Sequence, residues 1–282
     1  MLKDLVQKLL DGGVNPFHPD DEGKTALHYS AKGMAEKIIE GILIDRKQGV
    51  IIWEKASVGD KYGRNVLHVA VFLGRSRSFE FLLQGKRNMI DTKDRDGQSA
   101  IYYAVAGPHE KPSVLQRFLE AATIDPVFVT DFSQTTPLHV ASARGNLKMV
   151  EELLSVISGE ERKKNYVGSP YVMGQRALHK VASGGHWNVV EKLLEKGADP
   201  LKECDFDGKT ALHFAAQADG EDAVQIAKLL LSNSESDKQR SFLLFASAGE
   251  MGLCSNSSLE ECLQEETSKI LEKNREREFA LE

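Results

Sequence analysis

The chain has 282 residues, of which 41% are hydrophobic, so it is long enough and apolar enough to bury a continuous core. A net charge of -6 and a pI near 5.8 exclude the basic surface that is typical of nucleic-acid-binding proteins. No apolar run approaches the ~20 residues of a membrane-spanning helix, and the first residues lack the apolar segment of a signal peptide.

Cysteine usage bears on the compartment. The chain contains three cysteines, Cys204, Cys254 and Cys262. An odd number without paired spacing does not indicate a disulfide framework. We therefore expect reduced thiols and a cytoplasmic or nuclear protein.

A short phrase recurs along the chain, and its most complete copy is Thr136-Pro137-Leu138-His139. Thr136 predicts a helix N-cap, and Pro137 suits the first helical position because its missing N–H is not needed there. Gly145 ends this helix, and residues 147–157 then carry apolar side chains at the spacing of a second helix. Both helices are too short to be stable alone in water, so the unit needs neighbours.

The same phrase returns at a nearly regular interval. The positions equivalent to the histidine are His28, His68, Tyr102, His139, His179, His213 and Leu244, with successive spacings of 40, 34, 37, 40, 34 and 31 residues. A repeat of this length indicates one stack of similar units rather than separate globular domains.

A period near 33 residues together with a T-P-L-H-x-A phrase is typical of ankyrin repeats. On these residues the chain resembles the ankyrin-repeat family from residue 2 to about residue 250. The resemblance implies an all-α ankyrin-repeat solenoid over residues 20–252, in which helix-turn-helix units stack and carry short β-turn fingers. The predicted repeats span 20–45, 60–84, 94–122, 130–157, 172–200 and 205–232, and a worn copy follows at 242–249.

The two ends of the chain differ from the repeats. Residues 8–16 match residues 192–200, which end a repeat, so we expect residues 1–19 to form an N-terminal half repeat. This half repeat is either a cap or part of a longer protein. Residues 253–282 predict a charged helix, introduced by the capping-box spacing of Ser257 and Glu260, that serves as a terminal cap or as a linker to a further domain.

Two insertions interrupt the period, at residues 45–58 and 158–171. The apolar run 50–53 in the first insertion is expected to pack back on the stack. The second insertion begins with the charged run 159–164, which predicts an exposed helix extension or a mobile loop.

The recurring histidines raise the question of a metal site. Five of them occur once per repeat, never at the i, i+3 or i, i+4 spacing of a helical zinc site. The resemblance implies instead that each histidine bonds the Thr before its helix and the backbone of the neighbouring repeat. Asn65 and Ser99 replace that Thr and are able to cap, whereas Arg176 is not, so we expect a looser helix start in the fifth repeat.

Other motifs fail when their full patterns are required. Gly23-Lys24-Thr25 and Gly208-Lys209-Thr210 are similar to the end of a phosphate-binding loop, but His18 and Glu203 replace the Gly that such a loop needs five residues earlier. Two Asp-x-Asp-Gly turns lack the bidentate Glu of a calcium-binding EF-hand. The chain also lacks a G-x-S-x-G nucleophile motif. We therefore predict no catalytic residues, no cofactor and no metal, and we do not expect an enzyme.

The remaining candidates lie on the surface. In this fold the turn tips and the inner helices line one concave face, which varies while the core stays fixed. Aromatic and arginine side chains are frequent anchors of protein interfaces. The resemblance places the following candidate partner-binding residues at these positions: Lys61, Tyr62, Arg64, Phe72, Arg95, Gln98, Phe132, Ser133, Arg144, Phe206, Lys209 and Gln217.

The sequence thus predicts a protein–protein interaction module, an adaptor or scaffold that binds a partner protein through the concave face. The alternative is a regulatory or sensing region of a larger channel, kinase or NTPase that acts on its own other domains. We expect a monomer without nucleic-acid binding or membrane insertion. Fold alone does not fix the partner.

Overall fold

The computed structural model describes residues 8–33, 36–45, 50–85, 88–108, 112–121, 125, 128–200, 204–216, 221–233, 264 and 268. The chain divides into two compact units, Met1–Pro137 and Leu138–Glu282. The worn repeat at 242–249, Gln217 and all of the tail except residues 264 and 268 lie outside the described residues.

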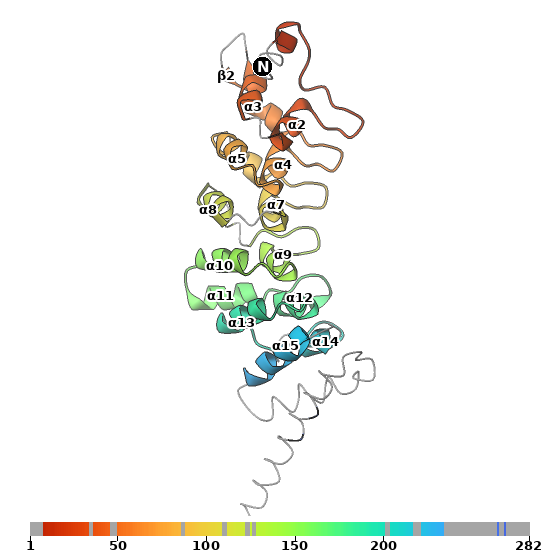
Figure 1. The fold of residues 1–282 in the computed structure, drawn as a ribbon, viewed down its shortest axis with the longest axis vertical. Coiled ribbons are helices and arrows are strands. Elements are labelled where there is room, and N and C mark those ends of the chain that lie inside the picture. The colour runs from red at the N-terminus through yellow and green to blue at the C-terminus, as the bar shows by residue number, and fades with distance from the viewer. Residues whose placement is uncertain are drawn as a thin grey trace, which may run out of the picture. The chain divides into compact units, whose positions relative to one another are not determined.

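Unit 1 consists of stacked helix pairs (Figure 1). The inner helices α2, α4 and α7 pack on one another in that order, and the outer helices α3, α5 and α8 form a second row. The inner helices span Ala26–Lys32, Val66–Phe72 and Ala100–Ala106, and the outer helices span Glu36–Leu43, Ser76–Leu83 and Pro112–Ala121. The first three predicted repeats are therefore present as helix pairs, and residues 8–11 before them are helical.

Unit 2 repeats this arrangement. Helix α12 packs on α14, and the outer helices pack in the order α10, α13 and α15. Its inner helices are α9 (Pro137–Ala143), α12 (Ala177–Ser183) and α14 (Ala211–Ala216), and its outer helices are α10 (Leu147–Ser155), α13 (Trp187–Glu195) and α15 (Glu221–Ser232). Helix α9 begins at Pro137, directly after Thr136, as the sequence predicts.

The first insertion packs back on unit 1. Strands β1 (Ile44–Asp45) and β2 (Val50–Ile51) pair antiparallel, and the short helix η1 (Trp53–Ser57) follows. The Trp53 ring lies 5.4 Å from the Phe81 ring on α5. The predicted packing is thus confirmed, although the sequence did not indicate this small hairpin or helix α6 (Asn88–Asp91).

The second insertion is more buried than its charged sequence suggests. Helix α11 (Glu160–Val167) starts on exposed acidic residues and ends on Tyr166 and Val167, which are fully buried. The Tyr166 hydroxyl accepts a hydrogen bond from the backbone N–H of Leu138 at 3.2 Å. The expected helix is present, but its last turn belongs to the core, and the short helix η3 (Val172–Gly174) follows it.

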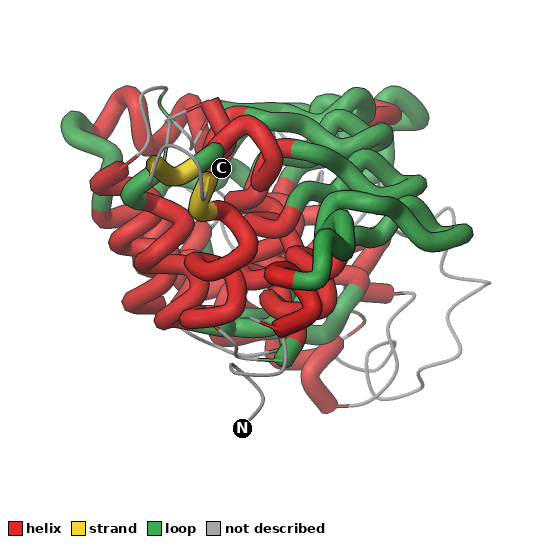
Figure 2. Tube along the Cα trace, turned by 90° about the horizontal axis from the view of Figure 1, so that it is seen from above, coloured by secondary structure: helices red, strands yellow, loops and turns green. Residues whose placement is uncertain are grey.

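A five-residue turn, here called a finger, precedes each inner helix. The fingers are residues 20–24, 60–64, 94–98, 131–135, 171–175 and 205–209. In each unit they project to the same side of the helices (Figure 2). In every finger the backbone N–H of the first residue donates to the carbonyl of the fifth residue, at 2.8–3.2 Å.

An aspartate closes five of the six fingers. Its Oδ1 atom accepts hydrogen bonds from the N–H groups of the third and fifth finger residues, at 2.8–3.0 Å. The fourth residue has a positive φ in every finger, and glycine fills that position except at Gln134. At Gly63 a Cβ would lie 2.9 Å from the backbone nitrogen of Arg95, so the next finger also requires glycine there.

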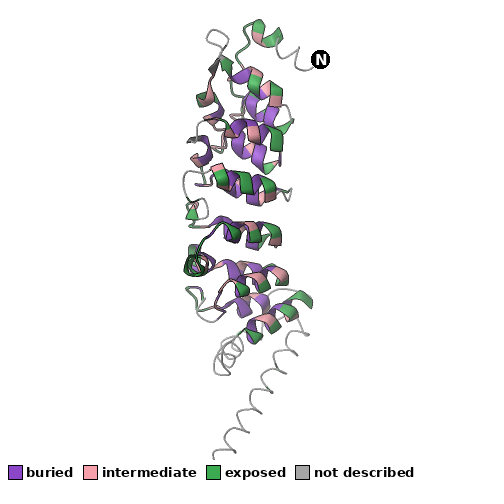
Figure 3. Ribbon diagram, turned by 90° about the vertical axis from the view of Figure 1, so that its left-hand side faces the viewer, coloured by how far each residue is buried: buried purple, intermediate pink, exposed green. Residues whose placement is uncertain are grey.

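The core of each unit lies between the helix rows, where buried residues concentrate (Figure 3). In unit 2 the outer-helix pair Leu193 and Leu194 is buried, as is Leu212 on α14. Helix α14 packs against both α12 and α15. Each short helix therefore gains its stability from its neighbours.

Replacing Leu212 tests this dependence. Leu212→Asp would bury an unpaired carboxylate between helices, which typically costs about 3–5 kcal/mol. We expect the variant to lose the helical signal of several repeats in urea unfolding followed by circular dichroism. Gln225→Asp on the exposed side of α15 is the control and is expected to unfold like the parent. A cooperative transition unchanged by Leu212→Asp would contradict the model of neighbour-dependent repeats.

Candidate functional site

A recurrent hydrogen bond joins successive repeats within each unit. The Nε2 atom of His28 lies 2.9 Å from the carbonyl oxygen of Arg64, and that of His179 lies 3.1 Å from the carbonyl of Lys209. His139 reaches the carbonyl of Ser169 in the same way, at 3.0 Å. The acceptor in the first two pairs is the last residue of the next finger, so the histidines anchor the fingers as the resemblance implied.

The other ring nitrogen fixes the protonation of these histidines. The Nδ1 atom of His28 accepts from the backbone N–H of Thr25 at 3.1 Å, and His68 accepts from Asn65 at the same distance. An Nδ1 that accepts leaves Nε2 to carry the proton and donate. In His28 the neutral ring therefore satisfies both the helix start and the next finger, whereas the buried Nε2 of His68 makes no hydrogen bond within the described residues.

Substituted positions keep the junctions by other means. The Tyr102 hydroxyl replaces a histidine and donates to the carbonyls of Val129, at 3.0 Å, and Thr135. The Asn65 side chain caps α4 by accepting from the His68 N–H at 3.1 Å, as predicted, whereas Ser99 makes no side-chain cap.

The expected looser start of the fifth repeat is not observed. The backbone N–H of Arg176 donates to His179 Nδ1 at 3.0 Å, and α12 begins at Ala177. The Arg176 guanidinium also donates to the carbonyls of Gly168, at 2.9 Å, and Cys204, at 3.1 Å. Arginine therefore replaces the missing cap with bonds to two neighbouring segments.

Burial keeps His28 and His68 of unit 1 neutral. Burial lowers the pKa of His68 to about 4, while the nearby Asp94 carboxylate and the backbone of Gln98 and Thr92 favour the protonated ring. Burial likewise lowers the pKa of His28, although the hydrogen bond to the carbonyl of Arg64 acts to raise it. Neither ring is a charged group at neutral pH.

The fingers are also joined to one another. In unit 1 the N–H of Lys61 donates to the carbonyl of Glu22, and that of Arg95 donates to the carbonyl of Tyr62, both at 2.9 Å. In unit 2 the N–H of Phe206 donates to the carbonyl of Met173 at 3.0 Å. Because backbone groups make this ladder, the side chains of the second and third finger residues, here called the finger tips, are not needed for it.

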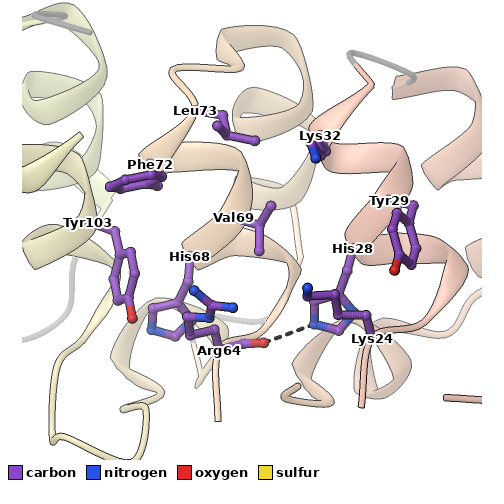
Figure 4. A pocket seen from close by; sticks show the side chains of 10 residues that line it. All are labelled: Lys24, His28, Tyr29, Lys32, Arg64, His68, Val69, Phe72, Leu73 and Tyr103. Carbon is purple, nitrogen blue, oxygen red and sulfur yellow. Dashed lines mark hydrogen bonds between the residues drawn. The ribbon is translucent and has the colours of Figure 1, made fainter. Parts of the chain in front are cut away.

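A cavity of about 200 Å³ opens between α2, α4 and α7 of unit 1 (Figure 4). Lys24 and Arg64 lie at its finger end and Lys32 at the opposite end, with aromatic rings on both flanks. The lining residues are Lys24, His28, Tyr29, Lys32, Arg64, His68, Val69, Phe72, Leu73 and Tyr103.

Three carboxylates lie near this cavity without lining it. Asp20 accepts from the Tyr29 hydroxyl and Asp94 from the Tyr103 hydroxyl, both at 2.6 Å. Burial acts to raise the pKa of Asp60, but hydrogen bonds from Arg64 outweigh it and the pKa is lowered. All three carboxylates are therefore engaged within the fingers.

The predicted surface residues fall into local groups. In unit 1 both Arg64 and Phe72 line the cavity. The Tyr62 ring is 50% exposed and lies beneath the cationic groups of Lys61 and Arg64. Phe132 rests against Gly97 of the preceding finger and is still 75% exposed. Arg95 and Ser133 are exposed and Gln98 is half-buried.

Fewer candidates lie together in unit 2. Phe206 rests against Gly174 and is 81% exposed, Lys209 is half-buried in the same finger, and Arg144 is exposed after α9. Val172 and Met173, which the sequence did not single out, are also exposed, and the Met173 carbonyl accepts a hydrogen bond from the N–H of Phe206. Lys24, Tyr29, Lys32 and Tyr103 of the cavity were also not predicted, although Tyr29 and Tyr103 both directly follow the histidine-equivalent position, which was a usable signal.

Comparison with known families decides the classification. The model for ankyrin repeats matches three copies, over residues 1–91, 79–165 and 157–241. The chain belongs to the ankyrin-repeat family. The ankyrin repeat is a non-catalytic protein-interaction fold.

Relatives of this ankyrin chain are larger proteins. It is 28% identical over 219 residues to the human transient receptor potential cation channel subfamily A member 1, covering 76% of this chain and 18% of the channel. It is 24% identical over 229 residues to the E3 ubiquitin-protein ligase KEG of Arabidopsis thaliana, covering 79% and 14%. The chain thus spans less than a fifth of the length of both relatives.

A solved ankyrin structure supports the fold. The crystal structure of the ankyrin repeat domain of Bcl-3 matches with a TM-score of 0.59 at 20% identity, over 80% of this ankyrin chain and 91% of that chain. The described part of the chain contains no helix long and apolar enough to cross a membrane. The same residues contain no cluster of His, Cys, Asp and Glu that could hold a metal ion.

The buried His68 predicts acid sensitivity. Because its folded pKa of about 4 lies below the unfolded value of ~6.5, the unfolded chain binds the proton first. Its contribution to stability is complete above about pH 6.5 and is lost as the pH falls toward 4, about 2 kcal/mol of it by pH 5.

The test compares the free energy of unfolding in urea at about pH 7.5 and about pH 5. His68→Gln should reduce the difference between the two pH values, whereas His18→Gln, at an exposed position, should leave it unchanged. An equal pH dependence in the parent and His68→Gln would show that His68 does not carry this effect.

Proposed function

We propose that this chain is a protein–protein interaction module that acts as an adaptor or scaffold in the cytoplasm or nucleus. It binds a partner protein through the fingers and inner helices, the concave face of the fold. The observation that carries this proposal is the set of aromatic finger tips. Tyr62, Phe132 and Phe206 are 50%, 75% and 81% exposed.

The finger tips are free to serve binding because backbone bonds hold the fingers. The ladder from finger to finger and the aspartate bonds use no tip side chain in the first, second, third and sixth fingers. An exposed aromatic ring buries a large area when a partner covers it and loses little conformational entropy. Tip residues can therefore vary without loss of the fold.

The second candidate is a regulatory or sensing region of a larger protein. The small share of the channel and ligase that the chain matches supports this candidate. In that case the same face would bind another domain of its own protein. The reading frame of the gene beyond both ends of this sequence distinguishes the two candidates.

The first experiment is affinity capture from lysate with the purified chain and with a Tyr62→Ala/Phe132→Ala/Phe206→Ala variant, followed by mass spectrometry. We expect a partner that the parent retains and the folded variant loses, because the variant removes three interface anchors. Val58→Ala/Val156→Ala, which removes exposed apolar side chains outside the fingers, is the control and should retain the partner.

Two other outcomes contradict the proposed face. A partner held equally by the parent and the triple variant would place the interface at the insertions or the tail. Absence of any captured protein would favour a regulatory region that acts within its own protein.

A further inference from the structure

We infer that the cavity between α2, α4 and α7 accepts a short acidic segment of a partner protein, with one large apolar side chain inside and carboxylates above the two ends. This inference deepens the proposed function and rests on it. It follows from the size of the cavity, the chemistry of its walls and the spacing of its charges.

The walls of the cavity suit an apolar side chain. Val69 of α4 and Leu73, which directly follows this helix, lie between the rings of Tyr29 and Phe72. Phe72 packs edge-on against Tyr103, with ring centroids 6.1 Å apart. Tyr29 and Phe72 remain 53% and 38% exposed, so both rings have apolar area that a partner could cover.

The volume distinguishes a peptide side chain from a whole small molecule. The cavity measures about 200 Å³. Pockets that hold a whole small molecule are commonly ~300–1,000 Å³. The space therefore suits one large aliphatic or aromatic side chain of a segment that lies across the opening.

The charged groups at the cavity are cationic. Lys24 and Lys32 line it, and their ammonium groups form no hydrogen bond or ion pair within the described part of the chain. Arg64 donates through Nε and Nη2 to Asp60, which leaves its Nη1 group available. No carboxylate lines the cavity, so the side that a partner approaches offers donors without acceptors.

The opposing carboxylates do not cancel this complementarity. Asp20, Asp60 and Asp94 accept bonds from finger N–H groups as well as from Tyr29, Arg64 and Tyr103. Their oxygens are thus used on the finger side. Lys24 is attracted to Asp20 only through space.

The spacing of the two lysines specifies the segment. Lys32 ends α2 and Lys24 lies two residues before its start; the helix itself rises ~9 Å from Ala26 to Lys32, and the finger residues add to this distance. An extended chain rises ~3.3 Å per residue, so acidic residues about four positions apart reach both lysines. The preferred segment therefore carries two acidic residues with a large apolar residue between them.

Peptide display tests this inference directly. A library of random peptides is selected on the full chain, and the affinities of selected peptides are measured by fluorescence anisotropy. We expect a consensus with Asp or Glu on both sides of Leu, Phe, Tyr or Trp. Lys24→Gln/Lys32→Gln should weaken binding about tenfold or more, and raised salt should weaken binding to the parent.

The matched control removes the same charge elsewhere. Lys37→Gln/Lys228→Gln changes exposed lysines of α3 and α15 and should bind within about twofold of the parent. Val69→Phe, which fills the cavity, should also abolish binding while the circular dichroism spectrum is kept.

Several outcomes would overturn the inference. These are no enriched peptide, a basic or uncharged consensus, and equal affinities for the parent and Lys24→Gln/Lys32→Gln. A consensus that matches Leu259–Leu263 of this chain would assign the cavity to its own tail instead of an external partner. If the captured partner depends on Tyr62, Phe132 and Phe206 but not on the two lysines, the proposed function holds and this inference fails.

Discussion

The structure depends on a hydrogen bond that recurs between successive repeats and is donated by His28, Tyr102, His139 and His179. A neutral ring such as His28 accepts from the start of its own helix and donates to the last carbonyl of the following finger. The bond therefore fixes the position of a helix relative to the finger of the next repeat. Because the helices are too short to be stable alone, this tie and the shared apolar faces are what make each unit of the stack.

The fingers show how the fold separates stability from recognition. Aspartate oxygens and backbone groups fix the turn, and glycine admits the backbone of the next finger. The residues between them point outward and are little used by the fold. The tips are therefore the part of the chain on which a binding surface can change with the least loss of stability.

The repeats were predictable because individual residues in the sequence mark where each helix and each turn begins. Pro137 marks the first residue of α9, and the Asp-x-x-Gly turns mark the fingers. The hairpin at Ile44–Ile51 and the burial of Tyr166 were not predictable, because both depend on contacts with distant helices. The cavity escaped prediction for the same reason, since its lysines and aromatic rings come from three helix pairs.

Tyr102 gives one junction a different chemistry from its neighbours. A phenol holds its proton throughout acidic and neutral conditions, whereas an imidazole gains one as acid is added. The bonds from Tyr102 to Val129 and Thr135 therefore persist in acid. Protonated His28 would still donate through Nε2 to Arg64 but would no longer accept from the N–H of Thr25, so acid disturbs the start of α2 rather than the link to the next finger.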